Sequence, residues 1–140
     1  IVADQRTREA LLADVHVKRA FEAFDDLDIA FVGIGAPTTE SVTMRDGSII
    51  TRAELDDLLR KGTVGDIALR YYDADGECIE SEINERIIGI TLDQIKKVPK
   101  VVGVSGGPQK VAAIRAALAG ELINVLITDS VTAEKLLEAA

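Results

Sequence analysis

The segment VVGVSGGPQKVAAIR, residues 101–115, joins an apolar run to a glycine turn and then to an amphipathic run. Its first four residues are three valines around one glycine, and a short β-branched run of this kind predicts a buried parallel strand. Ser105, Gly106 and Gly107 then end the strand, because glycine continues neither a strand nor a helix without cost. The segment therefore predicts a strand that runs into a tight turn.

A helix is predicted directly after this turn. Pro108 suits the first helical position, where its missing N–H is no loss. Gly120 stands where a helix C-cap is expected. The apolar residues that recur between them at helical spacing are Val111, Ile114 and Leu118. The resulting order of strand, glycine turn and helix is the unit from which parallel α/β sheets are built.

The glycine turn is also a candidate anion site. The first N–H groups of a helix have no partners within the helix and lie at the positive end of its dipole. Gly106 and Gly107 let an anion approach the backbone, and Lys110 adds a full positive charge. Because a helix end contributes only about 0.3–2 kcal/mol per charge, a phosphate needs several such donors. A plain turn with a solvated lysine explains the same residues, and the motif is neither a Walker loop nor G-x-G-x-x-G.

The composition describes one soluble globular domain, or a large piece of one, with an aliphatic core. The 140 residues are 47% hydrophobic and 4% aromatic. The net charge of −8 argues against binding of DNA or an anionic membrane by this segment, but permits a local basic pocket. The single Cys78 forms no internal disulfide and suggests a reducing, cytoplasmic location. No apolar run approaches the ~18 residues of a membrane span, and we expect no metal or cofactor.

Strands alternate with helices along the chain, which predicts a parallel sheet covered by helices and interrupted by an antiparallel hairpin. Asp4, Asp14, Thr51, Thr91 and Asp129 are each expected to cap a helix. The expected strands are residues 29–34, 64–72, 77–83, 87–90, 101–104 and 123–127. A turn at 73–76 joins residues 64–72 and 77–83 into the hairpin, and another turn is expected at 45–47. Apolar side chains predicted to point inward include Phe21, Phe24, Leu55, Leu58, Leu59, Ala133, Leu136 and Leu137. The polar residues 36–50 form either a functional loop or a connector.

Two further features lie near the ends of predicted strands. Residues Gly33-Ile34-Gly35 follow one strand as residues 105–107 follow another, and ligands collect beyond the carboxyl ends of parallel strands. The two turns are therefore placed to face one crevice. Asp66 has two interpretations that the sequence does not separate: a carboxylate that binds sugar hydroxyls, or a turn-capping carboxylate paired with Arg70. With His16 as the sole histidine, catalytic-triad chemistry has no support.

Taken together, these segments resemble the SorC family of bacterial transcriptional regulators, and specifically their C-terminal sugar-binding domain. The resemblance covers nearly all 140 residues and rests on motifs in the same order and spacing. These motifs are residues 28–35 (DIAFVGIG), 62–66 (GTVGD), 86–90 (RIIGI), 98–99 (VP), 102–110 (VGVSGGPQK) and 126–129 (LITD). The resemblance implies a fold similar to that of sugar-phosphate isomerases, glucosamine-6-phosphate deaminase and CoA transferases.

The resemblance also implies a function and a set of residues. The effector is a phosphorylated sugar, the protein is a homodimer or homotetramer, and DNA is bound by an N-terminal helix-turn-helix domain. The Gly-Gly-x-x-Lys loop falls on Gly106, Gly107 and Lys110, next to Ser105, and the acidic sugar-binding position falls on Asp66. Gly33 and Gly35 line the cleft.

On this interpretation, residues 1–140 are the C-terminal portion of the effector domain. The helix-turn-helix domain and the first part of the effector domain would lie outside them. The chain is then not an enzyme, and ligand binding shifts the arrangement of the oligomer. The alternative is a sugar-phosphate isomerase or deaminase of similar fold with Asp66 as general base. A pure oligomerisation module is a third option.

Overall fold

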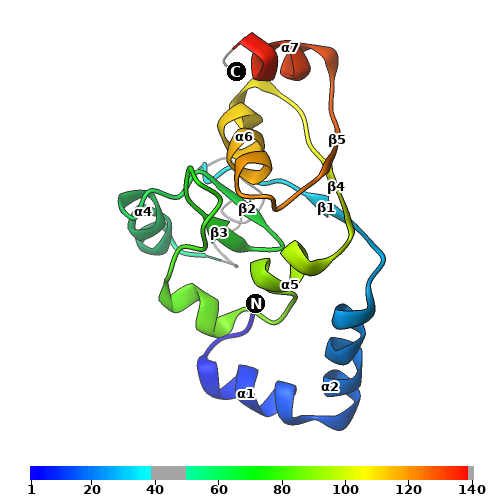
Figure 1. Cartoon of the computed structure of the whole chain (residues 1–140). Helices are drawn as coiled ribbons and strands as arrows, with labels where there is room; N and C mark the ends of the chain where they lie inside the picture. Colours follow the sequence, from blue (N-terminus) through cyan, green and yellow to red (C-terminus); the bar gives the residue numbers. More distant parts are fainter. Residues whose placement is uncertain (39–49, 139–140) are drawn as a thin grey trace.

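The computed structural model describes residues 1–38 and 50–138. Its strands form two sheets, in agreement with the predicted α/β class (Figure 1). The larger sheet is parallel, with the order β1 (Ile29–Gly33), β4 (Lys100–Val104), β5 (Val125–Ile127). The smaller sheet is an antiparallel pair, β2 (Gly65–Ile67) and β3 (Arg70–Tyr72). The sequence therefore predicted both the parallel sheet and the antiparallel insert.

Short helices connect and cover these strands. The α-helices are α1 (Gln5–Ala13), α2 (Val15–Glu22), α4 (Arg52–Arg60), α5 (Leu92–Lys97), α6 (Val111–Ala119) and α7 (Ser130–Glu138). The 3-10 helices are η1 (Ala23–Asp26), η2 (Glu82–Arg86) and η3 (Pro108–Lys110). The predicted side-chain caps are present at Asp4, Asp14, Thr51, Thr91 and Asp129. No helix of the described ranges is long and apolar enough to cross a membrane.

The central strand–turn–helix unit forms as expected, with one difference. Pro108 begins η3, and α6 follows at Val111. The buried side of α6 consists mainly of alanines, whereas Leu118 is exposed, contrary to the predicted stripe. α6 ends against the turn at residues 73–76, and glycine is needed at both contact positions because an added Cβ on Gly76 would lie 2.6 Å from Cα of Gly120.

The hairpin β2–β3 lies between two hydrophobic clusters. Tyr72 belongs to the cluster formed with α5, α6 and β4, while Tyr71 belongs to the cluster formed with α4 and η2. The predicted hairpin of residues 64–72 and 77–83 is wrong, because the chain already turns at Ala68 and Leu69, whose φ angles are +53° and +65°, and residues 77–83 contribute only an isolated bridge between Tyr72 and Cys78. Two successive residues with positive φ form the tight turn that suits an antiparallel hairpin.

Arg70 explains why residues 87–90 do not form the predicted strand. Its guanidinium is buried and donates to the carbonyl oxygens of Asn84, Gly89 and Ile90 at 3.5, 3.1 and 3.1 Å. These carbonyls satisfy a side chain instead of a neighbouring strand. Two predicted inward-facing leucines, Leu59 and Leu137, are also exposed.

One face of the parallel sheet is open. Residues paired in register point to the same side of a sheet, and Phe31 pairs with Val102, which in turn pairs with Val125. On this side Phe31 is 71% exposed and Ile127 is 52% exposed. Residues 29–33 thus form the predicted strand but with one side exposed, while Val102 in the central strand is buried on the same face. Only the alternate residues, among them Val32, pack on the core.

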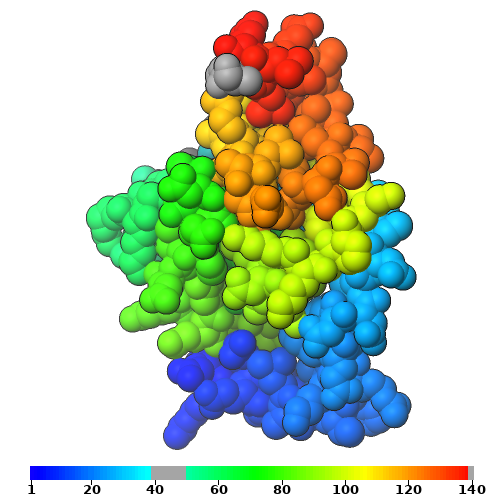
Figure 2. All heavy atoms as spheres, viewed as in Figure 1, coloured from blue at the N-terminus to red at the C-terminus, as the bar shows by residue number. Residues whose placement is uncertain are grey.

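The helices α1 and α2 lie at one end of the molecule, and α6 and α7 lie at the other (Figures 1 and 2). Neither α1 nor α2 contains a buried residue. Phe21 and Phe24 make an edge-on ring contact with centroids 5.0 Å apart, and both are only half-buried. The backbone of Val2 and the side chain of Arg8 attach this end to the carbonyls of Arg86 and Ile87. The turn predicted at residues 45–47 lies outside the described residues.

Candidate functional site

The ends of β1 and β4 meet at one atom, the carbonyl oxygen of Ile34. Lys110 donates to it through Nζ at 2.6 Å, and Ser105 donates through Oγ at 3.2 Å. The turns after the two strands are therefore joined by these two hydrogen bonds, whereas the crevice that they were predicted to face stays a prediction. The lysine comes from η3, so the glycine turn after β4 brings its ammonium group across to the end of β1.

Within residues 1–38 and 50–138, Lys110 forms no ion pair with a carboxylate, although its positive charge acts on Asp66. Each ion pair recorded in the described part of the chain involves other residues. A carbonyl oxygen fixes the position of an ammonium group but leaves its net charge in place. The ammonium of Lys110 therefore remains able to attract an anion at the carboxyl end of the sheet.

Asp66 is brought to the same place by a short antiparallel bridge. Gly35 N–H donates to the carbonyl of Asp66 at 2.8 Å, and Asp66 N–H donates back to Gly35 at 3.2 Å. A Cβ on Gly35 would lie only 1.8 Å from Oδ1 of Asp66. Glycine at position 35 is therefore what allows the carboxylate to lie against the end of β1.

The surroundings of Asp66 alter its protonation. Burial raises the pKa of this carboxyl group above its usual value, although the backbone amide of Leu69 and the positive charge of Lys110 act in the opposite direction. Burial also raises the pKa of Tyr72, and the negative charge of Asp66 adds to that effect. Tyr72 stays a neutral donor, with its hydroxyl on the carbonyl of Ala113 at 3.0 Å.

The proposed pairing of Asp66 with Arg70 is wrong. Within the described residues, the three side-chain hydrogen bonds of Arg70 all go to backbone carbonyls of residues 84, 89 and 90, outside the hairpin. The turn-capping part of that interpretation is supported, because the amide of Leu69 favours the charged form of Asp66. The carboxylate thus faces Lys110 and Gly35.

The glycine loop is held more firmly than the sequence suggested. Gly107 has a φ of +105°, and its N–H donates to Thr132 Oγ1 at 2.8 Å and to Asp129 Oδ2 at 3.0 Å. The N–H of Gly107 is therefore already paired with Thr132 and Asp129, which lie at the start of α7 and outside its own helix. Gly106 lies against the same carboxylate, since a Cβ there would be 2.2 Å from Asp129 Oδ2.

Comparison with known proteins places this geometry in a family. The family model "Sugar-bind", a sugar-binding domain, matches residues 1–138. The transcriptional regulator LsrR of Klebsiella pneumoniae subsp. pneumoniae is 39% identical over 142 residues, an alignment that covers 99% of this chain and 44% of that protein. The chain belongs to the sugar-binding domain family of SorC-type transcriptional regulators.

Solved structures of this family have the same fold as this sugar-binding domain. The full-length sorbitol operon regulator SorC from Klebsiella pneumoniae superimposes with a TM-score of 0.88 at 31% identity, over 98% of this chain and 44% of that chain. A DeoR family transcriptional regulator from Listeria monocytogenes gives 0.92 at 32% identity, over 97% of this chain and 55% of that chain. This sugar-binding domain therefore spans less than half the length of the curated relatives it matches.

Within this domain, the structure groups most but not all of the predicted site residues. Ser105 and Lys110 bind the Ile34 carbonyl, Asp66 lies against the adjacent Gly35, and Gly106 and Gly107 lie beside Asp129. Gly33 is apart: it pairs in register with Val104 on the open face of the sheet, and nothing lies within 4 Å of the position of its Cβ.

Sequence analysis missed three participants. The Ile34 carbonyl is a backbone group and Thr132 is an ordinary helical position, so neither carries a sequence signal. Asp129 was predicted only as a helix cap, although it also binds the glycine loop.

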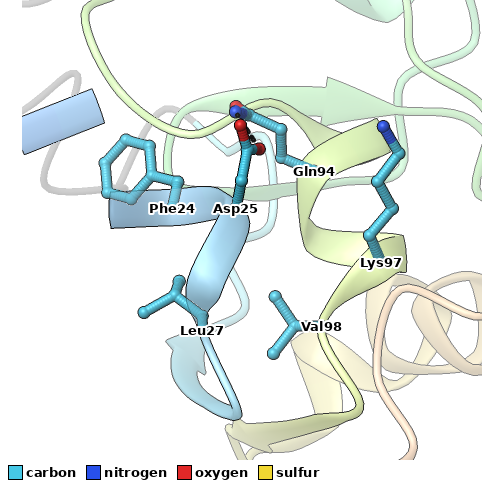
Figure 3. Close-up of a pocket in the computed structure, with 6 residues that line it drawn as sticks. All are labelled: Phe24, Asp25, Leu27, Gln94, Lys97 and Val98. Atoms are coloured by element: carbon cyan, nitrogen blue, oxygen red, sulfur yellow. Dashed lines mark hydrogen bonds between the residues drawn. The ribbon is translucent and has the colours of Figure 1, made fainter. Parts of the chain in front are cut away.

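A hollow lies at the opposite ends of strands β1 and β4, between η1 and α5 (Figure 3). It has a volume of about 230 Å³, and the side chains of Asp25 and Gln94 point toward each other across it, with a hydrogen bond of 3.3 Å. Its one carboxylate is thus already bound. No cluster of three or more potential metal ligands occurs among the described residues.

Proposed function

We propose that this domain senses a phosphorylated sugar and transmits its presence to the DNA-binding part of a transcription regulator. The observation that carries the proposal is the ammonium of Lys110 on the Ile34 carbonyl, which forms no ion pair within the described residues and acts on the half-buried carboxylate of Asp66. A cation with an available charge and a nearby carboxylate form a suitable pair for a ligand that has a phosphate at one end and hydroxyls at the other.

Each residue has a distinct proposed role. Lys110 binds the phosphate as a point charge. Asp66 accepts hydrogen bonds from sugar hydroxyls, and Gly35 leaves the space for it. Ser105 and Gly106 line the loop. Gly33 has no proposed contact with the ligand, because it lies on the other face of the sheet.

The proposed response is a shift between arrangements of a homodimer or homotetramer. A ligand that binds one arrangement more tightly raises its population and so changes how the DNA-binding domains are presented. DNA is contacted by another domain, in keeping with the net charge of −8 of this chain. Such a regulator acts in the cytoplasm. The named relatives are regulators, which favours a sensor over an enzyme.

The open face of the sheet supports the proposal that residues 1–140 are the C-terminal part of a larger effector domain. Parallel sheets are normally covered on both faces, whereas here Phe31 is exposed and an apolar groove of about 400 Å³ runs along the edge strand β1. Since the chain covers 55% of the Listeria monocytogenes regulator structure, relatives have enough additional chain to cover this face. We assign that role to the preceding part of the domain, with the helix-turn-helix domain before it.

The test uses the full-length protein and a panel of aldose, ketose and amino-sugar phosphates, each beside its unphosphorylated parent. A thermal shift is expected with at least one phosphate; a ligand at ~100 times its dissociation constant adds about 2.7 kcal/mol to the stability. The same ligand should change operator binding. A panel without any shift would contradict the proposal.

The alternative function is an isomerase or deaminase in which Asp66 is a general base. The raised pKa of this buried carboxyl is what such a base requires. Product formation from the same panel, abolished by Asp66→Asn, would establish the enzyme. Ligand binding without turnover would establish the sensor.

A further inference from the structure

The loop that carries Lys110 is held from outside by two residues at the start of α7. Thr132 is completely buried, and its hydroxyl accepts from Gly107 N–H at 2.8 Å while donating to Asp129 Oδ2 at 2.7 Å. Asp129 Oδ1 accepts from the N–H of Thr132 at 2.8 Å, so the same carboxylate caps the helix. We infer that Thr132 and Asp129 are positioning residues, which fix the glycine loop so that Lys110 stays on the Ile34 carbonyl. This inference rests on the proposed function.

The direction of each hydrogen bond follows from charge. Asp129 accepts hydrogen bonds from Thr132 and from Gly107, and these bonds lower the pKa of its carboxyl group. The carboxylate therefore stays ionised and can only accept. The Thr132 hydroxyl must therefore give its proton to Asp129, and its lone pair is left facing Gly107 N–H. Asp129 thus sets the orientation of Thr132, and Thr132 in turn holds the loop.

The loop transmits this restraint to the lysine over three residues. Lys110 N–H donates to the carbonyl of Gly107 at 2.9 Å, closing the single turn of η3. A displacement of Gly107 therefore moves the backbone of Lys110 as well. Gly107 has a φ of +105°, which L side chains rarely adopt, so the conformation depends on glycine and on these two acceptors together.

The arrangement also limits where a phosphate can lie. The N–H of Gly107 is already bound, and the carboxylate of Asp129 repels a second anion beside Gly106. The phosphate is therefore expected at the ammonium of Lys110, on the side of the loop away from Asp129. A phosphate bound at Lys110 should therefore change the hydrogen bond between Gly107 and Thr132, and through it the first turn of α7.

The test compares Thr132→Val with Thr132→Ser in the full-length protein, with inorganic phosphate as the probe. Valine keeps the shape of threonine but removes the hydroxyl, whereas serine keeps the hydroxyl. Phosphate affinity is measured by NMR titration, and the proton shift of the Gly107 amide reports on its hydrogen bond. Thr132→Val is expected to weaken phosphate binding at least fivefold and to move the Gly107 amide upfield, while Thr132→Ser stays within twofold of the wild type.

Each outcome decides a separate point. If phosphate binds the wild type and Thr132→Val equally although the Gly107 amide has moved, the positioning role is overturned. If Thr132→Val does not fold, hydrogen exchange in the wild type decides: phosphate should slow exchange at Gly107 and Thr132, and binding without any change there overturns the inference. If phosphate does not bind the wild type while the Gly107 amide remains protected, the proposed phosphate binding is contradicted and the positioning of the loop by Thr132 is not.

Discussion

The Nζ atom of Lys110 lies 2.6 Å from the carbonyl oxygen of Ile34, 76 positions away in the sequence. This hydrogen bond joins the helical turn after the central strand to the end of the edge strand. It orients the ammonium with a neutral partner, so the positive charge is fixed in place and remains available.

Replacing Lys110 with alanine should weaken binding of the phosphorylated sugar identified by the panel much more than binding of its parent. A hydrogen bond to a charged group contributes about 1.5–3 kcal/mol, or roughly a 10- to 150-fold change in affinity. Calorimetric titration of both ligands measures the difference. Lys96→Ala is the control, because Lys96 pairs with Glu77 on the surface. Equal losses for the two ligands would show that Lys110 does not contact the phosphate.

Gly35→Ala should destabilise the protein, whereas Gly33→Ala should not. The new Cβ at position 35 would meet Oδ1 of Asp66 at 1.8 Å, and nothing lies within 4 Å at position 33. Forcing atoms into a packed site typically costs about 1–3 kcal/mol, and an exposed substitution stays within about 0.5 kcal/mol. Urea denaturation measures both. Similar midpoints for the two variants would contradict the close approach of Asp66 to Gly35.

Asp66→Asn should stabilise the protein at neutral pH while weakening sugar binding. The pKa of Asp66 is raised above its usual value of 3.8 in the folded state, mainly by burial. Below pH 3.8 the group is protonated in both states and imposes no penalty. As the pH rises through the raised folded pKa, ionisation of the buried group removes stability. The advantage of the asparagine variant should therefore be larger at pH 7 than at pH 4.

Denaturation of the two proteins across this pH range is the measurement. Asp25→Asn provides the control, because Asp25 is an exposed carboxylate in the hollow between η1 and α5. An advantage of Asp66→Asn that does not change with pH would show that burial of the charge is not its cause.

Phe31→Ser should destabilise the full-length protein, although Phe31 is 71% exposed here. If the preceding part of the domain covers the sheet, the substitution removes a buried ring at a cost of about 3–5 kcal/mol. Val15→Ser on α2 is the matched control, because Val15 is also 71% exposed but lies away from the sheet. Thermal unfolding of the two variants gives the comparison, and equal small effects would mean that the sheet face remains open.

The local features of the fold were predictable because each depends on residues close together in the chain. Helix caps such as Thr51 and Thr91 satisfy N–H groups three residues away, and the strand, glycine turn and helix of residues 101–119 follow one another directly. Lys110 could be predicted as an effector-binding residue for the same reason, because its loop consists of consecutive residues. Leu118 was wrongly predicted to be buried, because helical spacing shows which residues share one side of a helix but not whether another element packs on that side.

Only the tertiary structure decided which distant residue contacts each residue of the site. The carbonyl under Lys110 belongs to Ile34, the carboxylate against Gly35 belongs to Asp66, and the hydroxyl on Gly107 belongs to Thr132. Periodicity and turn chemistry report which side of an element is apolar, but they do not report which distant element packs there. Residue order therefore determined the elements and the loop, and long-range packing determined which acceptors hold that loop and which face of the sheet stays open.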